Sequence, residues 1–366
     1  SQLAAAPRRG DHGSAAGTSG VGMSYRGPGP RFQRAPYGAP RVTRRYLGWV
    51  LPIGAVVAIA FLTIAGASQV RGRSAESAGT DDVTTMSRRA ARPARELLAP
   101  RGPAPRVDQS RAASLPMIPA RAYVLVDEAS GAVLAESGAT RRLAPASVTK
   151  IATAILLLEL GHLDDVVTVD VDFNDLEPDS TVMGLAPGDR YTFRDLLHGL
   201  MLRSGNDAAI AIARAVSGDE TRFVNTMNAL AARLELTDTH FTDPHGLGGP
   251  EHYTSARDLA ALTRYAFTLP GFAEVVGQTR WDTHGSKQIE LWNSNVFLYM
   301  YDGADGVKIG YTEEADRTLV ASATRDGHRL IAVVLGDSYA ATHAGNLLDW
   351  GWESACWPAA TGGCER

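Results

Sequence analysis

Lysine is scarce in this sequence of 366 residues: it occurs only as Lys150, Lys287 and Lys308, although lysine and arginine together number 36. Cysteine is scarcer still, with Cys356 and Cys364 at the end of the chain. No histidine lies near the two cysteines, which argues against a zinc or catalytic role for them. Positive charge in excess is also lacking, because the net charge is -4, so the composition does not indicate a nucleic-acid-binding protein.

The two cysteines stand in "CWPAATGGC", where a Gly-Gly pair allows the chain to bend. In an oxidising compartment this spacing predicts a small Cys356–Cys364 disulfide loop in a short tail, residues 355–366. Two free thiols in that tail are the alternative.

Acidic residues are almost absent from residues 1–45, where Asp11 is the only one. This stretch is rich in Gly, Pro, Ala, Ser and Arg, and it has too little apolar surface to offset the entropy of ordering. We therefore expect a disordered basic segment.

Charge of either sign is absent from Tyr46 to Val70. About 20 helical residues cross a ~30 Å hydrocarbon layer, so residues 46–68 are predicted to be a single transmembrane anchor. Arg41, Arg44 and Arg45 precede it directly, which places the N-terminus in the cytoplasm. The protein is thus expected in the cell membrane, with its folded part on the extracytoplasmic side.

The small residues 65–67, Ala-Gly-Ala, could be a signal-peptidase site after Ala67. The length of the apolar run and of the segment before it favours an uncleaved anchor. Residues 69–115 are again rich in Pro, Ala and Arg and are predicted to be a solvated linker. Residues 116–354 remain as one folded domain.

Strand and helix patterns alternate in blocks along this domain. Residues 121–136 predict a hairpin, five helical segments follow between residues 151 and 267, and strands return from residue 287 before a last helix over 341–354. The expected strands after the helices are "KQIELWN", "GVKIGYT", "TLVASATRDG" and "HRLIAVVLGD". This order predicts an α+β domain, with an antiparallel sheet flanked by helices and a second, all-helical lobe.

Ser147 and Lys150 form the one Ser-x-x-Lys of the chain, at the predicted start of a helix, where a spacing of three puts both side chains on one face. A serine hydroxyl needs a base to become a nucleophile, and a desolvated lysine can be that base. Arginine cannot, because it does not deprotonate in proteins. An N-capping serine beside a solvated lysine is the alternative.

The tripeptide Ser204-Gly205-Asn206 lies between two predicted helices. A hydroxyl and a carboxamide at such a corner can relay a proton and hold a substrate amide. In isolation the tripeptide equally fits a helix–helix turn with an asparagine cap.

The stretch from Lys308 to Thr312, "KIGYT", is predicted to be a strand. Gly310 would let a ligand backbone approach, Tyr311 could add a backbone N–H to an oxyanion pocket, and Lys308 would supply positive charge. A solvent-facing strand lysine is the alternative.

Together the three elements are the signature of penicillin-binding proteins and class A β-lactamases. From about residue 114 to 354 the chain resembles the serine D-Ala-D-Ala carboxypeptidases, the low-molecular-weight penicillin-binding proteins. The resemblance rests on "RRLAPASVTKIAT", "LMLRSGNDAAIAIA", "THFTDPHGLGGPEHYTSARDLA" and "GADGVKIGYTEEADRTLVASATRDGHRLIAVVLGD". It implies a β-lactamase/transpeptidase-like fold with the active site between the sheet and the helical lobe.

The resemblance also implies roles for the residues. Ser147 would be the acyl-enzyme nucleophile, Lys150 its base, Ser204 and Asn206 the relay and amide-holding pair, and Lys308 the charge on the third side. Gly310, Tyr311 and Thr312 complete the expected substrate-binding strand. The substrate would be a peptidoglycan stem peptide ending in D-Ala-D-Ala, and β-lactams would acylate the same serine. No cofactor or metal is expected.

Three positions depart from the family, and the first two concern recognition of the substrate's terminal carboxylate. Ile309 stands where the family usually has a threonine that helps hold the terminal carboxylate. The family's arginine after the last strand would fall near Thr342 and His343, but no arginine lies between Arg329 and Arg366. Asp316 replaces a usual glycine. A looser carboxypeptidase, or a D,D-endopeptidase acting on cross-links, is therefore an alternative.

Three further functions are alternatives to the carboxypeptidase. A class A β-lactamase needs a Glu-x-x-x-Asn, which does not occur between Asn206 and Lys308. A zinc peptidase would use His240, His245 and His252, but their spacing fits a structured loop beside the site better than a ligand set. A catalytically weak, membrane-tethered wall-binding protein would explain the lost carboxylate contacts.

Overall fold

The computed structural model describes residues 93–108, 110, 113–178, 180–358 and 363–365. The expected disordered segment 1–45 and anchor 46–68 lie outside these residues. Within the described ranges, no helix combines the length and apolar character needed to cross a bilayer. The chain divides into units 1–73 and 74–366, and everything below concerns the second.

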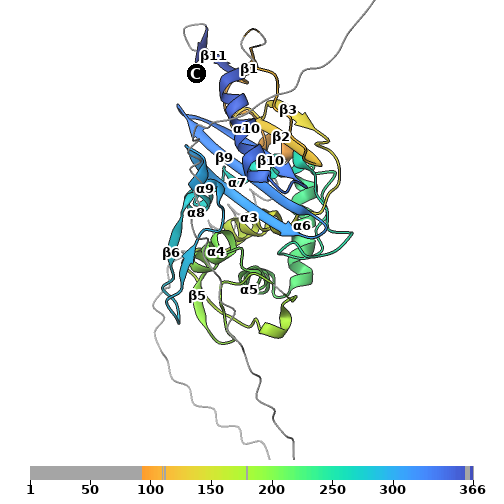
Figure 1. The fold of residues 1–366 in the computed structure, drawn as a ribbon. Helices are drawn as coiled ribbons and strands as arrows, with labels where there is room; N and C mark the ends of the chain where they lie inside the picture. Colours follow the sequence, from red (N-terminus) through yellow and green to blue (C-terminus); the bar gives the residue numbers. More distant parts are fainter. Residues whose placement is uncertain (1–92, 109, 111–112, 179, 359–362, 366) are drawn as a thin grey trace, which may run out of the picture. The chain divides into compact units, whose positions relative to one another are not determined.

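A five-stranded antiparallel sheet forms the centre of this unit, in the order β3-β2-β10-β9-β8 (Figure 1). Its side chains alternate between two apolar cores: Val124 and Val126 of β2 face one core, and Tyr123 and Leu125 face the other. Because both faces are covered, the strands read as nearly continuous apolar runs. The strands are β2 (Ala122–Asp127), β3 (Val133–Ser137), β8 (Ala304–Thr312), β9 (Asp316–Arg325) and β10 (His328–Leu335).

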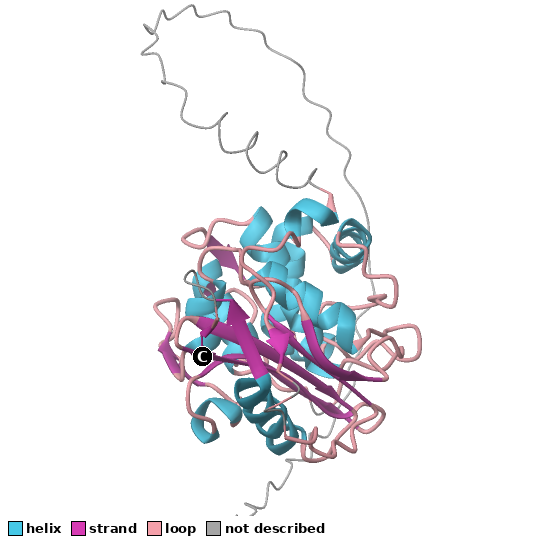
Figure 2. Ribbon diagram, turned by 90° about the horizontal axis from the view of Figure 1, so that it is seen from above, coloured by secondary structure: helices cyan, strands magenta, loops and turns pink. Residues whose placement is uncertain are grey.

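Helices cover both faces of the sheet (Figure 2). The C-terminal helix α10 packs on one face, and the helical lobe together with α7 packs on the other. This arrangement matches the α+β architecture expected from the sequence. The helices are α3 (Lys150–Leu160), α4 (Phe193–Leu202), α5 (Asn206–Ser217), α6 (Glu220–Arg233), α7 (Ala256–Ala266), α8 (Phe272–Gly277), α9 (Phe297–Met300) and α10 (Ala340–Ser354).

Side-chain caps fix the start of several helices. Thr192 caps α4 by accepting a hydrogen bond from the backbone N–H of Asp195, as the Thr-x-x-Asp pattern predicts. Ser255 caps α7 in the same way, through the N–H of Asp258. Each cap satisfies an N–H group that has no partner inside its helix.

Two small sheets lie beside the main one. The "KQIELWN" segment forms only β7 (Glu290–Trp292), which pairs with β6 (Arg280–Asp282) and not with the central sheet. Arg280 bridges the two strands, since its side chain forms an ion pair with Glu290 and lies over the Trp292 ring. The other small sheet joins β4 (Val166–Thr168) and β5 (Arg190–Thr192), and η2 (Phe173–Asp175) lies between them in sequence.

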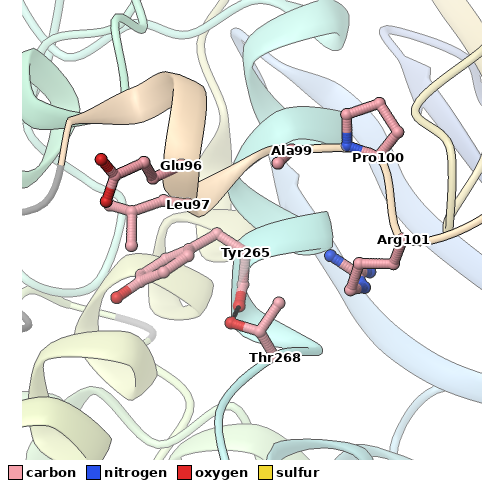
Figure 3. A pocket seen from close by; sticks show the side chains of 7 residues that line it. All are labelled: Glu96, Leu97, Ala99, Pro100, Arg101, Tyr265 and Thr268. Carbon is pink, nitrogen blue, oxygen red and sulfur yellow. Dashed lines mark hydrogen bonds between the residues drawn. The ribbon is translucent and has the colours of Figure 1, made fainter.

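Part of the expected linker packs on the domain. Helix α2 (Ala94–Leu97) buries Leu97, and Arg264 of α7 donates hydrogen bonds to the carbonyls of Leu98 and Ala129. A pocket of about 190 Å³ lies between the segment 96–101 and Tyr265 with Thr268 (Figure 3). The folded unit therefore includes described residues upstream of 116.

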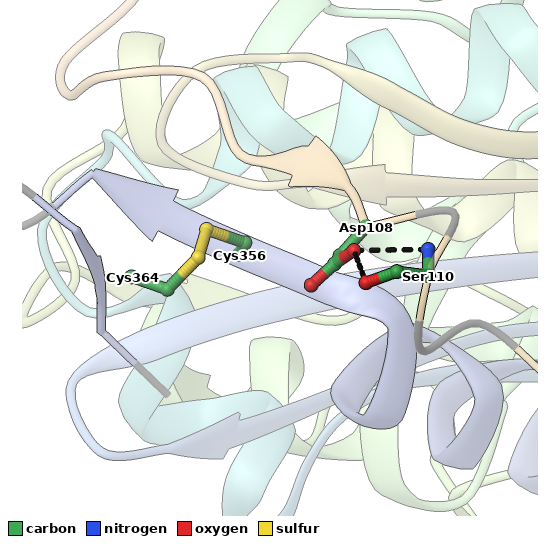
Figure 4. Close-up of a disulfide and its surroundings, with 4 residues drawn as sticks. All are labelled: Asp108, Ser110, Cys356 and Cys364. Atoms are coloured by element: carbon green, nitrogen blue, oxygen red, sulfur yellow. Dashed lines mark hydrogen bonds between the residues drawn. A yellow bond between two sulfur atoms is a disulfide. The ribbon is translucent and has the colours of Figure 1, made fainter.

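The two ends of the described unit meet in a third small sheet, β1-β11-β12. Strand β11 (Ala355–Pro358) pairs with β1 (Arg106–Val107) and with β12 (Cys364–Glu365). Cys356 and Cys364 form a disulfide with their Cα atoms 5.1 Å apart (Figure 4). The predicted tail loop is therefore part of a sheet that also holds the N-terminal segment.

Candidate active site

Ser147 lies in the 3-10 turn η1 (Ala146–Thr149), which leads directly into α3. Two glycines let neighbouring segments approach this turn. A Cβ at Gly246 would lie 2.0 Å from the carbonyl oxygen of Ala146, and one at Gly310 would lie 2.8 Å from the backbone nitrogen of Ser147. The turn is thus clamped between the loop 242–252 and strand β8. This contact supports Ala146, whose φ of 52° is unfavourable for an L-residue.

Lys150 is completely buried, and its amine has three polar neighbours. Nζ lies 2.9 Å from Ser147 Oγ, 2.7 Å from Asn206 Oδ1 and 2.8 Å from the carbonyl oxygen of His245. The last two atoms can only accept hydrogen bonds. A neutral amine would therefore donate its two N–H groups to them and direct its lone pair at the serine hydroxyl. This geometry suits a base for Ser147.

Electrostatics favours the neutral amine as well. Burial lowers the pKa of Lys150 well below its usual value, and repulsion from Lys308 lowers it further, against the attraction of Asp243 and Asp207. Burial alone lowers the pKa of Lys308 to about 7. If Lys150 is the first of the two to lose its proton, Lys308 no longer feels its repulsion. At neutral pH the positive charge of Lys308 is therefore only partly present.

The corner between α4 and α5 brings Ser204 and Asn206 to this site. Ser204 has a φ of 61° and is buried, and its carbonyl accepts a hydrogen bond from Thr181 Oγ1 at 2.7 Å. Asn206 accepts from Lys150 through Oδ1 and donates from Nδ2 to Ser180 Oγ at 3.0 Å. Its carboxamide therefore links the lysine to the loop before β5.

Asp207 anchors the loop before β5. Its buried carboxylate accepts hydrogen bonds from the backbone N–H groups of Met183, Gly184 and Leu185, at 2.8–3.0 Å. An anion that accepts several backbone bonds fixes the loop strongly. The position of Ser180 beside Asn206 depends on this anchor.

Strand β8 forms the opposite wall and is the outermost strand of the sheet. Lys308 is buried, and its Nζ donates to the carbonyl of Ile309 at 3.0 Å. Thr318 of β9, the register partner of Gly310, donates its hydroxyl to the carbonyl of Pro145 and so fixes β9 to the serine turn. Tyr311 is largely exposed, with a relative accessibility of 61%.

The loop 242–252 packs beside the site, as the sequence predicted. Asp243 accepts hydrogen bonds from the backbone N–H groups of His245, Gly246 and Leu247. Burial lowers the pKa of His245 to about 4, despite the nearby Asp243. His252 Nδ1 accepts from the Thr242 N–H, so its Nε2 carries the proton. In the part of the chain described, no three or more His, Cys, Asp and Glu side chains form a group suited to a metal.

Two of the three positions that depart from the family, Ile309 and His343, lie toward or on α10. Ile309 packs against the core under α10, on the opposite face from Val307 and its core. His343, in the first turn of α10, has Nδ1 2.5 Å from Asp337 Oδ2. Asp316 has a φ of 55°, a value that explains why glycine suits this place. Its carboxylate accepts from Ser338 at 2.8 Å.

The structure thus brings Ser147, Lys150 and Asn206 into direct contact. Ser204 lies two residues before Asn206 in the chain, and Lys308 is close enough to lower the pKa of Lys150. Thr312 lines a small pocket next to the serine turn. Sequence reasoning missed Ser180, Asp207, Asp243, Thr318 and the carbonyl of His245, because nothing in their residue types signals contact with the site.

A five-stranded antiparallel sheet with helices on both faces, and a Ser-x-x-Lys at the start of the central helix, define the serine acyl-transfer enzymes of the β-lactamase/transpeptidase fold. Residues 109–339 match the D-alanyl-D-alanine carboxypeptidase family, peptidase family S11, and the chain belongs to that family. The resemblance inferred from the sequence is confirmed.

Curated relatives carry the same family name. The D-alanyl-D-alanine carboxypeptidase DacC of Escherichia coli is 38% identical over 254 residues, which are 65% of this chain and 62% of that protein. DacB2 of Mycobacterium tuberculosis is 36% identical over 249 residues, 65% of this chain and 84% of the relative. The chain thus spans about three-fifths of the E. coli protein and most of the mycobacterial one.

Solved structures agree in fold. Penicillin-binding protein 6B of Escherichia coli has a TM-score of 0.62 at 35% identity, over 66% of this chain and 80% of that one. A mutant of the Streptomyces K15 DD-transpeptidase has a TM-score of 0.62 at 32% identity, over 65% and 99%. The predicted fold class is therefore confirmed.

Proposed function

We propose that the protein is a serine-type D-Ala-D-Ala carboxypeptidase that acts on peptidoglycan stem peptides through an acyl-enzyme on Ser147. The observation that carries this proposal is the buried Lys150 amine, 2.9 Å from Ser147 Oγ and also contacting two acceptor-only oxygens. Membership of the carboxypeptidase family supports the same substrate class. β-Lactams would acylate Ser147 as mimics of this substrate.

The reaction follows from the site in two steps. Lys150 takes the proton of the Ser147 hydroxyl while Oγ attacks the carbonyl carbon of the penultimate D-Ala. The peptide C–N bond then breaks, and the terminal D-Ala leaves as an amine that receives a proton. Water next attacks the ester carbonyl, one of its protons returns to Ser147 Oγ, and the shortened peptide is released.

The remaining site residues have proposed roles that fit their positions. The backbone N–H groups of Ser147 and Tyr311 would stabilise the oxyanion, since Gly310 brings β8 close to the serine turn. Asn206 would hold the substrate amide, and Ser204 would relay the proton to the leaving amine. Lys308 would add positive charge, which a bound carboxylate favours by raising the pKa of this lysine.

A second candidate is a D,D-endopeptidase that cuts cross-links. Ile309 favours it, because an isoleucine on the edge strand β8 offers no hydroxyl to a terminal carboxylate. A comparison of free-acid and amidated D-Ala-D-Ala peptides distinguishes the two. Equal cleavage of both would mean that the site does not require a free terminal carboxylate, as an endopeptidase needs, and cleavage of a cross-linked dimer would then establish the endopeptidase.

We also propose that residues 46–68 anchor the protein in the cell membrane, with the catalytic unit outside the cytoplasm. The uncharged run and the arginines before it support this orientation, and the Cys356–Cys364 disulfide fits an oxidising compartment. Protease treatment of intact spheroplasts tests it, because the catalytic unit should be digested while the cytoplasm stays intact. Protection of that unit would contradict the orientation.

The central test is covalent labelling of the purified chain by a fluorescent penicillin. We expect a stable label on the wild type and none on Ser147→Ala, because only the serine supplies the nucleophile. A wild type that takes no label has no serine acyl-enzyme. Rapid loss of the label would indicate a β-lactamase, and loss of peptidase activity with a chelator would indicate a zinc enzyme.

A further inference from the structure

We propose that the Ser180 hydroxyl is a positioning group that keeps the carboxamide of Asn206 in the one orientation that leaves Lys150 able to act as a base. The inference deepens the proposed function and rests on it, because it concerns the proton transfer from the same serine. It gives a role in the reaction to a residue that lies outside the three sequence motifs.

The Asn206 carboxamide has two orientations of the same shape that exchange a donor and an acceptor. In the structure its Oδ1 lies 2.7 Å from Lys150 Nζ, and its Nδ2 donates to Ser180 Oγ at 3.0 Å. Asn206 is buried, so bulk water does not replace these partners. Rotation of the carboxamide by half a turn would bring Nδ2 to the lysine and Oδ1 to position 180.

The two orientations have opposite effects on the lysine. With Oδ1 toward Lys150, this oxygen and the carbonyl of His245 take the two N–H groups of a neutral amine, and the lone pair points at Ser147. In the rotated orientation Nδ2 would donate to that lone pair. The amine could then no longer accept the serine proton, so the rotated orientation is inactive.

Ser180 decides between the orientations through the cost of an unpaired group. Without its hydroxyl, the active orientation leaves a buried amide N–H without an acceptor, whereas the rotated one leaves a carbonyl oxygen under-satisfied. Buried N–H groups without a partner are the rarer and more costly of the two. With the hydroxyl present, the active orientation loses nothing at position 180, and the N–H groups of the lysine select the amide oxygen.

The loop that carries Ser180 does not need this hydroxyl to stay in place. The carbonyl of Thr181 accepts from the Asn206 backbone N–H at 2.8 Å, and its Oγ1 donates to the Ser204 carbonyl at 2.7 Å. The Asp207 carboxylate binds three further N–H groups of the loop. Ser180→Ala should therefore leave the loop where it is and change the balance of the two orientations.

The test is the rate of acylation by a fluorescent penicillin as a function of pH, measured by stopped flow on the wild type and on Ser180→Ala. The inactive orientation requires a neutral lysine, because a protonated amine has no lone pair to accept from Nδ2. Its population competes with the active neutral form but not with the protonated enzyme. We therefore expect the high-pH rate of Ser180→Ala to fall by about tenfold. The midpoint of its acid limb should fall by about one pH unit, so that the two rates coincide at low pH.

Two further variants separate orientation from a general loosening of the loop. Ser180→Thr keeps the hydroxyl and should restore the wild-type profile. Thr181→Val removes a neighbouring hydroxyl that bonds to the Ser204 carbonyl and not to the carboxamide, so any loss should have one factor at every pH. The other charged or titratable groups that face the Lys150 amine are the same in all four proteins: Lys308 on β8, Asp207 on α5, and Asp243, His245 and His252 in the loop 242–252.

Each outcome has one meaning. A rate that is unchanged in Ser180→Ala, or lowered by one factor at every pH, would overturn the inference. A Ser180→Thr variant that behaves like Ser180→Ala, or a Thr181→Val variant with the same pH-dependent loss, would overturn it as well. A wild type that takes no penicillin label contradicts the proposed function itself, whereas any of these results with a labelled wild type contradicts only the role of Ser180.

Discussion

The site has two walls: a helical wall, made of α3, the corner between α4 and α5 and the loop 242–252, and a strand wall, made of β8. They differ in how firmly their polar groups are held. On the helical wall, the Lys150 amine contacts three oxygens, the Asp207 carboxylate accepts from three loop N–H groups, and the loop 242–252 is closed on its own aspartate. On the strand wall, the Lys308 amine has one hydrogen bond to a described residue, the carbonyl of its neighbour Ile309, and Tyr311 is largely exposed.

This difference separates two parts of the reaction. The helical wall activates the nucleophile, which requires atoms fixed to within a fraction of an ångström. The strand wall receives the substrate, and its polar groups can rearrange when a ligand binds. Two departures from the family lie outside the helical wall: Ile309 on β8, and His343 on α10, which packs on the sheet. We therefore expect acylation chemistry to be conventional for this fold and substrate selection to be individual.

Replacing Lys150 should have the largest effect, because its amine contacts Ser147, Asn206 and the carbonyl of His245 in the helical wall. Lys150→Arg keeps a cation but cannot accept the serine proton, so we expect the penicillin acylation rate to fall by about a thousandfold. Stopped-flow measurement of acylation gives the rate.

A lysine outside the site provides the control. Lys287 forms a surface ion pair with Asp189, and Lys287→Arg should leave acylation unchanged. An equal loss in both variants would mean that Lys150→Arg acts through the fold and not through the proton transfer.

Part of the helical wall could be predicted from the sequence, and the contacts that could not be predicted have a physical reason. Ser147 and Lys150 could be paired from the sequence because they lie within one helical turn. Asn206 followed from a tripeptide motif. The carbonyl of His245, 95 positions from Lys150, could not be predicted, since every residue has a carbonyl and none marks its use.

The fold was predictable wherever an element was long. Strands β9 and β10 have clear apolar runs with a turn at residues 325–327, and the long helices have apolar faces. Strand β1 has two residues and α2 has four, too few for any period to appear. Their docking on the domain is a tertiary effect, which residues 69–115 do not reveal by composition.

Asp207→Ala should have the next largest effect, because it removes the anchor of the loop before β5. Three loop N–H groups would lose a charged acceptor, so the free energy of unfolding should fall by about 3 kcal/mol. Acylation should also slow, because Ser180 would no longer be held beside Asn206. Denaturant unfolding measures the first effect. Asp164→Ala, which removes an exposed partner of Arg194, should change stability by less than about 1 kcal/mol.

The charge of Lys308 should make the strand wall sensitive to pH. Its pKa of about 7 means that the free enzyme loses this charge as the pH rises above neutrality. We expect kcat/KM for carboxylate-bearing substrates to fall by up to about tenfold for each unit above that pKa, until a neutral-form rate is reached. Lys308→Arg keeps its charge and should flatten this limb. A limb that persists in Lys308→Arg would assign the titration to another group.

The same lysine predicts a change of stability with pH. In the folded protein Lys308 loses its proton near pH 7, whereas an unfolded lysine keeps it to about pH 10.4. Between these values the unfolded state binds more protons, so this residue makes the protein more stable as the pH rises. Lys308→Met should weaken that rise in denaturant unfolding from pH 7 to 10. An unchanged slope would show that the lysine is charged when folded.

Ile309→Thr should have the smallest effect, and it sharpens the comparison because it alters the strand wall alone. The wild type should prefer a free-acid D-Ala-D-Ala peptide over its amide by less than the variant does, because a threonine hydroxyl can donate to a carboxylate. One charge-assisted hydrogen bond of ~1.5 kcal/mol would raise this preference by about tenfold. The penicillin acylation rate should change little, since the polar contacts of the Lys150 amine are made by other residues. Equal preferences in the two proteins would mean that position 309 does not select the carboxylate, and that the strand wall recognises it through another group.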